Sequence, residues 1–274
     1  MPELPEVETV VRGLARQLHG RTIIRVRCHA PRLRHPLRAR DFAPVRGRRI
    51  MAVRRRAKYI IVEFAGRWTL VLHLGMTGSF RFVPAGARRD KHDHIDWLLD
   101  DGRCLRYNDP RRFGSAAAEL LSVAGGDPPS LAALGPEPLG SALTADYLRQ
   151  RAAGRITAVK AFIMDQRVVV GVGNIYAAEA LFRARIRPTR AAGTVTMREW
   201  RRLVTEIRRV LAMAIRAGGT TISDYVAPDG SEGKFNVRLK VYGRAGRPCP
   251  ACGAVIRQQV IGGRSSFFCP KCQH

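Results

Sequence analysis

The chain begins with an amphipathic pattern. Apolar side chains recur at intervals of three and four residues, at Val7, Val10, Leu14 and Leu18. That spacing places them along one face of a helix. Gly20 stands where a helix is expected to end, and glutamates crowd the first turn, where the helix dipole favours negative charge. The pattern predicts an amphipathic helix over residues 3–19.

After this helix, and as far as Asn108, the pattern is typical of strands. Two segments, 48–64 and 68–74, flank a short turn that contains glycine. A second pair, 94–99 and 103–107, flanks an Asp-Gly turn, which is a strong signal for a β-hairpin. Several short strands at this spacing predict a β-sandwich or a β-barrel.

Helical spacing takes over in the second half of the chain. A stretch rich in Gly, Pro and Ser over residues 121–140 indicates a linker. Four helices are predicted after it, over residues 144–153, 156–165, 174–183 and 196–217. The stretch 218–235 has few apolar residues and several Gly, Ser and Asp, which predicts a mobile loop.

The charge of the chain indicates a polyanionic partner. Its 274 residues include 48 Lys and Arg against 22 Asp and Glu, a formal net charge of +26. Such an excess repels itself in a compact fold, and nucleic acid is its commonest partner. No run approaches the ~18 apolar residues of a membrane span, and no secretion signal follows the N-terminus. We therefore expect a cytoplasmic protein with a nucleic-acid partner and no membrane partner.

The cysteines predict a metal module in the tail that starts at Tyr242. They form two C-x2-C pairs separated by sixteen residues, Cys249, Cys252, Cys269 and Cys272. Two such turns close a tetrahedral site of four thiolates, so we expect one structural zinc ion without an open coordination position. The alternative is fortuitous thiol pairs or a redox motif. Cys28 and Cys104 stand alone in predicted strands and are expected to be core thiols.

The N-terminus offers a candidate nucleophile. Removal of Met1 would expose Pro2 as a secondary amine, and an α-amino group has a pKa of about 8, so part of it is neutral at neutral pH. A neutral secondary amine can attack C1′ of a deoxyribose, and Glu3 beside it can protonate the sugar ring oxygen. The structural alternative is that both residues simply start the helix, since proline favours the first turn. The residues alone favour that alternative.

One basic residue stands at a predicted hairpin tip between the two cysteine pairs. The segment Ile261-Gly262-Gly263-Arg264-Ser265 reads as a turn, and Arg264 on such a tip can contact a phosphate. A solvated turn is the alternative.

Five motifs together resemble formamidopyrimidine-DNA glycosylase over the whole chain and in the same order. They are Met1–Val10 (MPELPEVETV), Leu74–Gly78 (LGMTG), Asp109–Gly114 (DPRRFG), Gly171–Ala177 (GVGNIYA) and the four-cysteine tail. The resemblance implies an α+β multidomain fold: an N-terminal catalytic β-sandwich over 1–125, a helix-two-turn-helix domain over 130–225 and a zinc finger over 240–274. It also implies that double-stranded DNA crosses the cleft between the domains.

The resemblance implies a bifunctional enzyme of base-excision repair. Such an enzyme excises 8-oxoguanine and formamidopyrimidines and then cleaves the abasic site by β,δ-elimination. Pro2 then forms the Schiff base, which reverses the structural alternative given above, and Glu3 transfers protons. Lys58 matches a lysine credited as a proton donor in β-elimination, and Arg264 matches an arginine credited with assisting δ-elimination. The segment 218–235 matches the segment that closes over the flipped purine.

The resemblance also implies a set of DNA contacts. Flipping a base costs a few kcal/mol of stacking, which side chains entering the gap partly offset. Three residues match that role: Met76 in the void, Arg111 on the orphaned cytosine and Phe113 between base pairs. Four others match positions that face the DNA backbone: His92, Arg155, Lys160 and Asn174. Asn174 is also expected to be a helix N-cap, because it follows Gly171-Val172-Gly173.

The protein is expected to act as a monomer. Three other functions compete with this interpretation. Endonuclease VIII has the same architecture and nucleophile but prefers oxidised pyrimidines, and its N-terminus typically reads MPEGPE. A non-catalytic protein that binds lesions fits the charge and the zinc module equally well, but it does not need Pro2, Glu3 or Lys58. A ribosome-associated zinc-ribbon protein fits the charge but not the residues that fill the gap.

Overall fold

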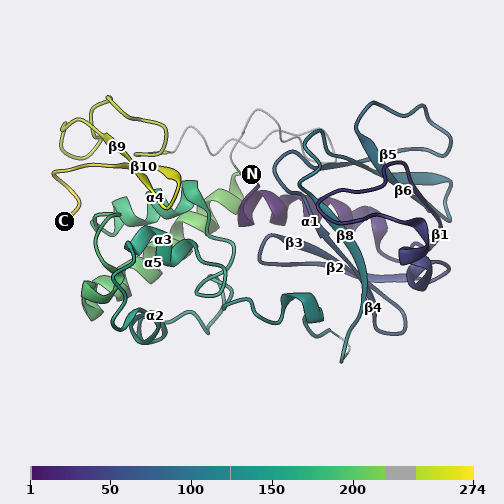
Figure 1. The fold of residues 1–274 in the computed structure, drawn as a ribbon, viewed down its shortest axis with the longest axis horizontal. Helices are drawn as coiled ribbons and strands as arrows, with labels where there is room; N and C mark the ends of the chain where they lie inside the picture. Colours follow the sequence, from purple (N-terminus) through teal and green to yellow (C-terminus); the bar gives the residue numbers. More distant parts are fainter. Residues whose placement is uncertain (1, 124, 220–238) are drawn as a thin grey trace. The chain divides into compact units, whose positions relative to one another are not determined.

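The computed structural model describes residues 2–123, 125–219 and 239–274, and these fall into two compact units. The first unit runs from the N-terminus to Ala132 and includes Gly218 and Gly219. The second contains Ala133–Ala217 and the described residues of the tail. Figure 1 shows that the first unit holds the N-terminal α-helix and most of the strands, and the second holds the other α-helices and a short hairpin.

Helix α1 spans Leu4–Leu18, as the apolar spacing predicts. A reciprocal capping box fixes its start: the Glu3 side chain accepts from the main-chain N–H of Glu6, and the Glu6 carboxylate accepts from the N–H of Glu3 at 2.9 Å. Such a pair satisfies two N–H groups that a helix start otherwise leaves open. The apolar face of α1 is buried in the core of the first unit.

The rest of the first unit is a sandwich of two four-stranded antiparallel sheets. One sheet has the order β1-β6-β7-β5, with β1 at Ile23–Cys28, β6 at Asp93–Leu99, β7 at Arg103–Asn108 and β5 at Ser79–Pro84. The other has the order β2-β3-β4-β8, with β2 at Ile50–Arg56, β3 at Tyr59–Phe64, β4 at Trp68–His73 and β8 at Ser115–Leu120. The inner faces of both sheets and α1 share one apolar core around Trp97. A short 3-10 helix, η1 at Ala39–Val45, adds Phe42 to it.

Both predicted hairpins are present, as β3–β4 and β6–β7. The expectation of one continuous strand over 48–64 is wrong, because the chain reverses at Ala57 and Lys58 and forms the separate strands β2 and β3. The two turn residues, Ala57 and Lys58, include no Gly, Pro, Asn or Asp that would mark the reversal in the sequence. Strand β8 was not predicted either, since its alanines give no alternation of apolar and polar side chains.

The second unit is built on four helices, namely α2 at Ala145–Ala152, α3 at Val159–Met164, α4 at Asn174–Arg183 and α5 at Met197–Arg216. Thr144 and Thr196 cap α2 and α5, each accepting from the third residue of its helix. Trp200 of α5 is fully buried and packs against Phe162 of α3. Short 3-10 turns lie at Pro129–Leu131 (η2) in the first unit and Ala192–Thr194 (η3) in the second.

Helix α3 is shorter than the predicted 156–165. The chain before Val159 is a loop that bonds to the segment ahead of α5: Gly193 donates to the Arg155 carbonyl, and Val159 donates to the Arg190 carbonyl. Ile156 is 92% exposed, so it does not belong to a buried helix face. Ile156 has the spacing of a helix residue in the sequence, but in the structure its side chain is exposed to solvent and does not pack on the core.

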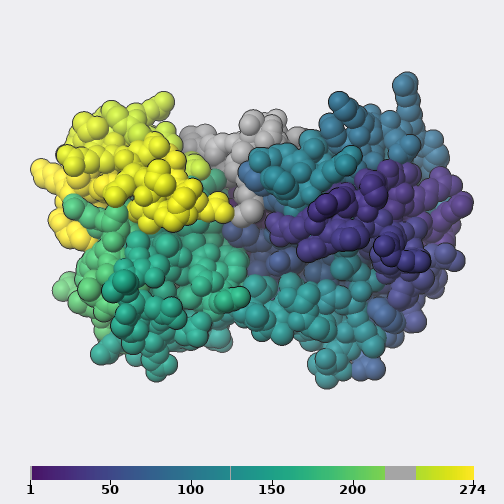
Figure 2. All heavy atoms as spheres, in the orientation of Figure 1, coloured from purple at the N-terminus to yellow at the C-terminus, as the bar shows by residue number. Residues whose placement is uncertain are grey.

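The tail forms a hairpin of β9, Arg257–Ile261, and β10, Arg264–Phe268, which packs on α4. In Figure 2 the yellow surface of this tail lies directly over the green surface of the helices. Glu179 of α4 is 2% exposed, and its carboxylate accepts the N–H groups of Lys240, Val241 and Tyr242 at 2.9 to 3.0 Å. A carboxylate bonded to three consecutive amides anchors the start of the tail to the helical domain.

The predicted mobile loop over 218–235 lies, apart from its first two residues, outside the described part of the chain. Within the described residues, no helix combines the length and the apolar character that crossing a membrane requires.

Candidate active site and DNA-binding residues

The four predicted zinc ligands meet at one point. The Sγ atoms of Cys249, Cys252, Cys269 and Cys272 all lie within 4.8 Å of one another. Two of the sulfur pairs are separated by 3.5 Å and 4.0 Å. Tetrahedral zinc with Zn–S bonds of about 2.3 Å requires S···S separations of about 3.8 Å. The donor set and its dimensions therefore fit a closed, structural zinc site.

Pro2 and Glu3 lie at the head of α1 and are buried. Glu3 is 3% exposed and is the N-cap residue of the helix. The capping box holds its carboxylate in one orientation, directly beside the residue whose amine is the candidate nucleophile. The two readings of these residues are therefore compatible: they start the helix, and the capping box holds a buried carboxyl group on the residue that follows the proline.

Lys58 lies in the tight turn between β2 and β3 and is 6% exposed. The preceding residue, Ala57, has a φ of +56°, a conformation that costs a residue with a Cβ of order 1 kcal/mol. Arg55 holds this turn, because its Nη1 donates to the Ala57 carbonyl at 3.0 Å. The Nε of Arg55 donates to Glu8 of α1, also at 3.0 Å. The turn that carries Lys58 is thus tied to the same helix that Pro2 and Glu3 precede.

His73 lies close to the turn that carries Lys58, although the sequence did not single it out. It ends strand β4, is 8% exposed, and its ring packs on that of Tyr59. Its Nδ1 accepts from the N–H of Gly75 at 2.9 Å, which leaves the proton on Nε2. Burial, reinforced by the positive charges of Arg34 and Lys58, lowers the pKa of His73 to about 4. The histidine is therefore a neutral hydrogen-bond donor at neutral pH.

We expect His73 to make the first unit sensitive to acid. In the unfolded chain His73 binds a proton below pH 6.5, whereas in the folded chain it does so only below about pH 4. The free energy of unfolding therefore falls as the pH is lowered through this window. Between pH 7 and pH 5 the loss is about 2 kcal/mol. His73→Asn keeps an acceptor near the Nδ1 position and should lack this loss. Urea unfolding followed by tryptophan fluorescence in a Trp200→Phe background measures it, and equal pH slopes in the two proteins would contradict the assignment.

The three residues predicted to fill the gap in DNA lie on two neighbouring loops of the first unit. Met76 is 36% exposed, Phe113 is 44% exposed, and Arg111 is exposed as well. The guanidinium carbon of Arg111 lies 4.8 Å from the centre of the Phe113 ring, a cation–π arrangement. None of the three is a core residue. An exposed methionine, an exposed phenylalanine and an arginine on neighbouring loops suit insertion into a base stack.

His92 precedes β6 in a loop that a buried ion pair holds. Arg106 is 2% exposed and forks onto the Asp96 carboxylate at 2.8 Å and 3.0 Å. Its remaining nitrogen donates to the Arg88 carbonyl, which ties down the loop that leads to His92. The carbonyl of His92 itself accepts from the N–H of Asp109, so this position is connected to the DPRRFG loop.

In the second unit Lys160 and Asn174 form one hydrogen-bonded cluster with the zinc-finger hairpin. Lys160 is 1% exposed, and its Nζ donates to Oδ1 of Asn174 at 2.5 Å and to Oγ of Ser266 at 2.6 Å. Asn174 donates in turn to the Ser265 carbonyl at 3.0 Å. The expected N-cap role of Asn174 is wrong: Gly173 is the N-cap, and Asn174 is the first helical residue. The side-chain amide of Asn174 is bonded to Lys160 and to the hairpin, and it does not cap the start of α4.

Arg264 and Arg155, the two predicted arginines of the second unit, are both exposed. Arg264 begins β10 directly after the glycine turn, next to the serine that Lys160 and Asn174 hold. Arg155 is exposed on the loop before α3. Lys160 therefore positions its neighbours, while the two arginines have guanidinium groups at the surface.

One residue of the tail was overlooked in the sequence. Gln273 is fully buried, its Oε1 accepts from the N–H of Cys269, and its Nε2 donates to the Ile186 carbonyl. It therefore fastens the second cysteine pair to the chain that follows α4. Side-chain amides near a chain end give no periodic signal that would predict such a role.

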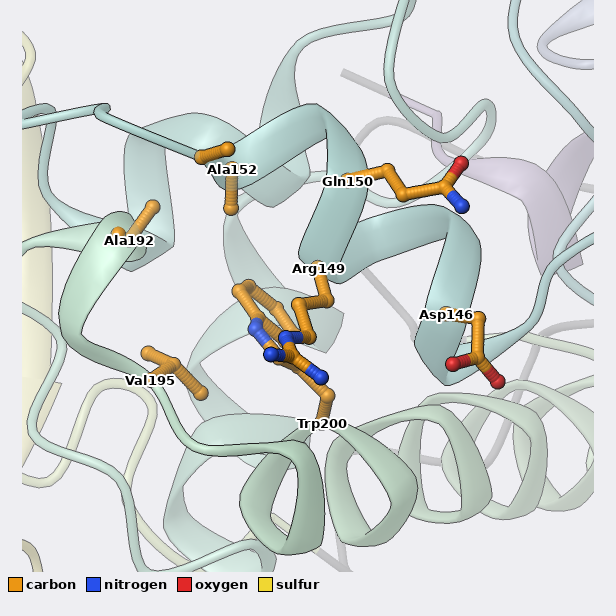
Figure 3. Close-up of a pocket in the computed structure, with 9 residues that line it drawn as sticks. Asp146, Arg149, Gln150, Ala152, Ala192, Val195 and Trp200 are labelled. Atoms are coloured by element: carbon orange, nitrogen blue, oxygen red, sulfur yellow. The ribbon is translucent and has the colours of Figure 1, made fainter.

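A hollow of about 520 Å³ lies elsewhere in the second unit (Figure 3). Its walls come from α2 and η3, and the buried ring of Trp200 on α5 contributes as well. It is lined by Asp146, Arg149 and Gln150 on its polar side, and it contains none of the residues predicted from the sequence. The candidate chemistry is therefore not located in this hollow.

A zinc-stapled hairpin that carries an exposed arginine and packs on a helical domain is typical of nucleic-acid-binding proteins, as is a net charge of +26. The fold and the site thus define a zinc-finger DNA-binding protein with a candidate amine nucleophile.

Three family models match the chain in succession. They are the formamidopyrimidine-DNA glycosylase N-terminal domain over 1–116, its H2TH domain over 134–226, and the zinc finger found in FPG and IleRS over 246–274.

Relatives extend this match over the full length. The formamidopyrimidine-DNA glycosylase of Alkalilimnicola ehrlichii is 52% identical over 282 residues, and all of both chains is covered. The crystal structure of the MutM (Fpg) protein from Thermus thermophilus superposes with a TM-score of 0.87 at 43% identity, covering 99% of this chain and 98% of that one. A structure of MutM in complex with DNA containing carbocyclic 8-oxo-G gives a TM-score of 0.89 at 32% identity, with both chains fully covered. The chain belongs to the formamidopyrimidine-DNA glycosylase family.

Proposed function

We propose that this protein is a DNA-repair enzyme that removes oxidised purines from duplex DNA and then cuts the strand at the abasic site it has created. The buried Glu3 carboxyl group, held by the capping box beside Pro2, carries the proposal. Full-length relatives that bear the glycosylase name and a related structure that holds 8-oxo-G DNA support the same conclusion.

The excision step requires an amine and a proton donor at the sugar. The lone pair of the Pro2 nitrogen attacks C1′, the bond from C1′ to the base breaks, and the base leaves with the bonding electrons and takes up the proton that the Pro2 nitrogen loses once it is bonded to carbon. Glu3 protonates the ring oxygen, the sugar ring opens, and an iminium ion joins Pro2 to the sugar. In this proposal the capping box fixes the carboxyl group where that proton is needed.

Strand cleavage follows from the same iminium ion. It withdraws electrons, so a proton is lost from C2′ and the 3′ phosphate leaves, and a second elimination releases the 5′ phosphate. Lys58 serves as proton donor in the first elimination, and Arg264 assists the second by neutralising the phosphate. The bond from Arg55 to the Ala57 carbonyl supports this role for Lys58, because it fixes the turn to α1.

The remaining site residues hold the DNA. Met76, Arg111 and Phe113 occupy the space left by the extruded purine, and Arg111 faces the orphaned cytosine. His92, Arg155 and Asn174 face backbone phosphates. Lys160 acts through Asn174 and the hairpin, as its burial and its hydrogen bonds indicate.

The proposal divides the chain into the catalytic sandwich at 1–125, the helix-two-turn-helix domain at 130–225 and the zinc finger at 240–274. Its partner is double-stranded DNA that contains oxidised purines or abasic sites, and it acts as a monomer. A DNA substrate and four cysteines that must stay reduced to bind zinc support a place of action at the nucleoid in the cytoplasm.

The test is base release from defined duplexes. With 8-oxoguanine opposite cytosine we expect release of the damaged base and a gap with phosphates at both ends, and no cut with undamaged guanine. We expect release at least about tenfold faster than that of an oxidised pyrimidine in the same context. The reverse preference would indicate the endonuclease VIII specificity. Tight binding to the lesion without release would indicate a lesion-binding protein.

A further inference from the structure

The loop that carries Met76 and the loop that carries Arg111 and Phe113 are joined by one side chain, that of Thr77. Its hydroxyl donates to Oδ1 of Asp109 at 2.6 Å and accepts a hydrogen bond from the main-chain N–H of Arg111 at 3.3 Å. A hydroxyl has one proton to donate and two lone pairs, so one side chain serves both partners. The residue directly after Met76 is thereby bonded to the backbone of Arg111.

Asp109 is the fixed point of this arrangement. Its side chain is fully buried, and its second oxygen accepts from the N–H of Gly114 at 2.8 Å and from the hydroxyl of Tyr107 at 3.2 Å. Burial and the neighbouring carboxylate raise the pKa of Tyr107 well above its ordinary value, so the hydroxyl keeps the proton it donates. Thr77 is therefore bonded to a carboxylate that is itself held from two further directions.

Two glycines, Gly75 and Gly78, allow the two loops to pack in close contact. Gly75 has a φ of +62°, and a Cβ there would lie 2.4 Å from the carbonyl carbon of Phe113. A Cβ on Gly78 would lie 2.2 Å from the Tyr107 hydroxyl. Backbones that approach this closely cannot slide past one another. These contacts and hydrogen bonds thus hold the two loops in a fixed arrangement relative to one another.

We propose that Thr77 is a positioning residue that fixes Met76 relative to Arg111 and Phe113, so that the three side chains enter the DNA as a preformed unit and Arg111 discriminates the opposite base. The inference rests on the proposed function and extends it to specificity. A preformed unit spends no binding energy on ordering side chains when the purine is extruded. Arg111 distinguishes cytosine from another base only while its backbone is fixed, because hydrogen-bond readout depends on geometry.

The test compares Thr77→Val, which keeps the shape and removes both hydrogen bonds, with Thr77→Ser, which keeps the hydroxyl. Thr69→Val is the matched control. Thr69 is a fully buried threonine of the first unit, whereas Thr77 is half-buried, and the Thr69 hydroxyl donates to the Val62 carbonyl in the sheet at 3.0 Å. Single-turnover excision of 8-oxoguanine is measured opposite cytosine and opposite adenine, together with cleavage of a preformed abasic site in single-stranded DNA, where no opposite base or void exists.

We expect Thr77→Val to lower excision opposite cytosine by at least about tenfold and to reduce the preference for cytosine over adenine. Cleavage of the single-stranded abasic site should fall far less, and Thr77→Ser and Thr69→Val should both resemble the parent protein. Equal excision by Thr77→Val and Thr69→Val would overturn the inference, as would a uniform loss on all three substrates or a Thr77→Ser variant as impaired as Thr77→Val. If the parent protein itself excised no 8-oxoguanine, the proposed function would fall.

Discussion

A chain in which an alanine is inserted ahead of Pro2 should form no covalent adduct with damaged DNA under borohydride. The insertion turns the proline nitrogen into an amide, whose lone pair is delocalised and cannot attack C1′. We expect base excision and strand cleavage to fall at least about 1000-fold, the scale on which enzymes lose activity when a covalent nucleophile is removed. The measurement is trapping on a duplex with 8-oxoguanine opposite cytosine, with the adduct mapped by mass.

The control for this experiment is affinity. The insertion leaves the exposed loops and the basic surface intact, so binding to the same duplex should stay within about threefold of the parent, because phosphate contacts supply most of the affinity. The N-terminal mass of the parent must show that Met1 is gone, since a retained methionine blocks the amine in the same way. An adduct that persists at full yield in the extended chain would assign the nucleophile to another residue.

Loss of the zinc ion should release the C-terminal hairpin from the helical domain. The short tail buries few apolar side chains, and structural zinc supplies about 10–16 kcal/mol of folding free energy in domains of this kind. Cys252→Ser should therefore bind no zinc, and its affinity for DNA should fall at least about 100-fold, because Arg264 is no longer held on an ordered tip. Metal analysis and a binding titration measure the two effects.

The matched control is another thiol of the same chain. Cys104 is 4% exposed on the first unit, outside the cysteine cluster, and burial raises its pKa to about 11, so it is an inert thiol at neutral pH. Cys104→Ser should retain one zinc ion per chain and the affinity of the parent. If Cys252→Ser kept both zinc and affinity, the four cysteines would not be the site that orders the hairpin.

Local signals were sufficient for much of the fold. Periodic apolar spacing gave α1 and the long helix α5, and glycine-containing turns gave the β3–β4 and β6–β7 hairpins. These features depend on neighbours in the chain, so a sequence displays them directly. The same holds for the cysteine pairs, whose spacing alone specifies a tetrahedral site.

Features that depend on distant neighbours were missed or misread. The turn at Ala57 contains none of the residues that usually mark a turn. It is stabilised by the hydrogen bond from Arg55 to the Ala57 carbonyl and by the hydrogen bond from Arg55 to Glu8 of α1. Asn174 was predicted to be an N-cap from the residues just before it. Its hydrogen bonds to Lys160 and to the hairpin connect segments far apart in the chain, so the neighbouring sequence could not predict them. His73 and Gln273 likewise gain their roles only from what surrounds them.

The sequence by itself determined the partner class, the zinc ligands, the candidate amine at Pro2 and, through its motifs, the family. These follow from charge, spacing and order along the chain, which folding does not change. Only the tertiary structure decided which polar groups are neutral, which are buried and which side chains hold others in place. Burial sets the protonation of His73, and long-range hydrogen bonds make Thr77 and Lys160 positioning residues. Desolvation and contact are properties of the folded chain, because both require segments far apart in sequence to exclude water together.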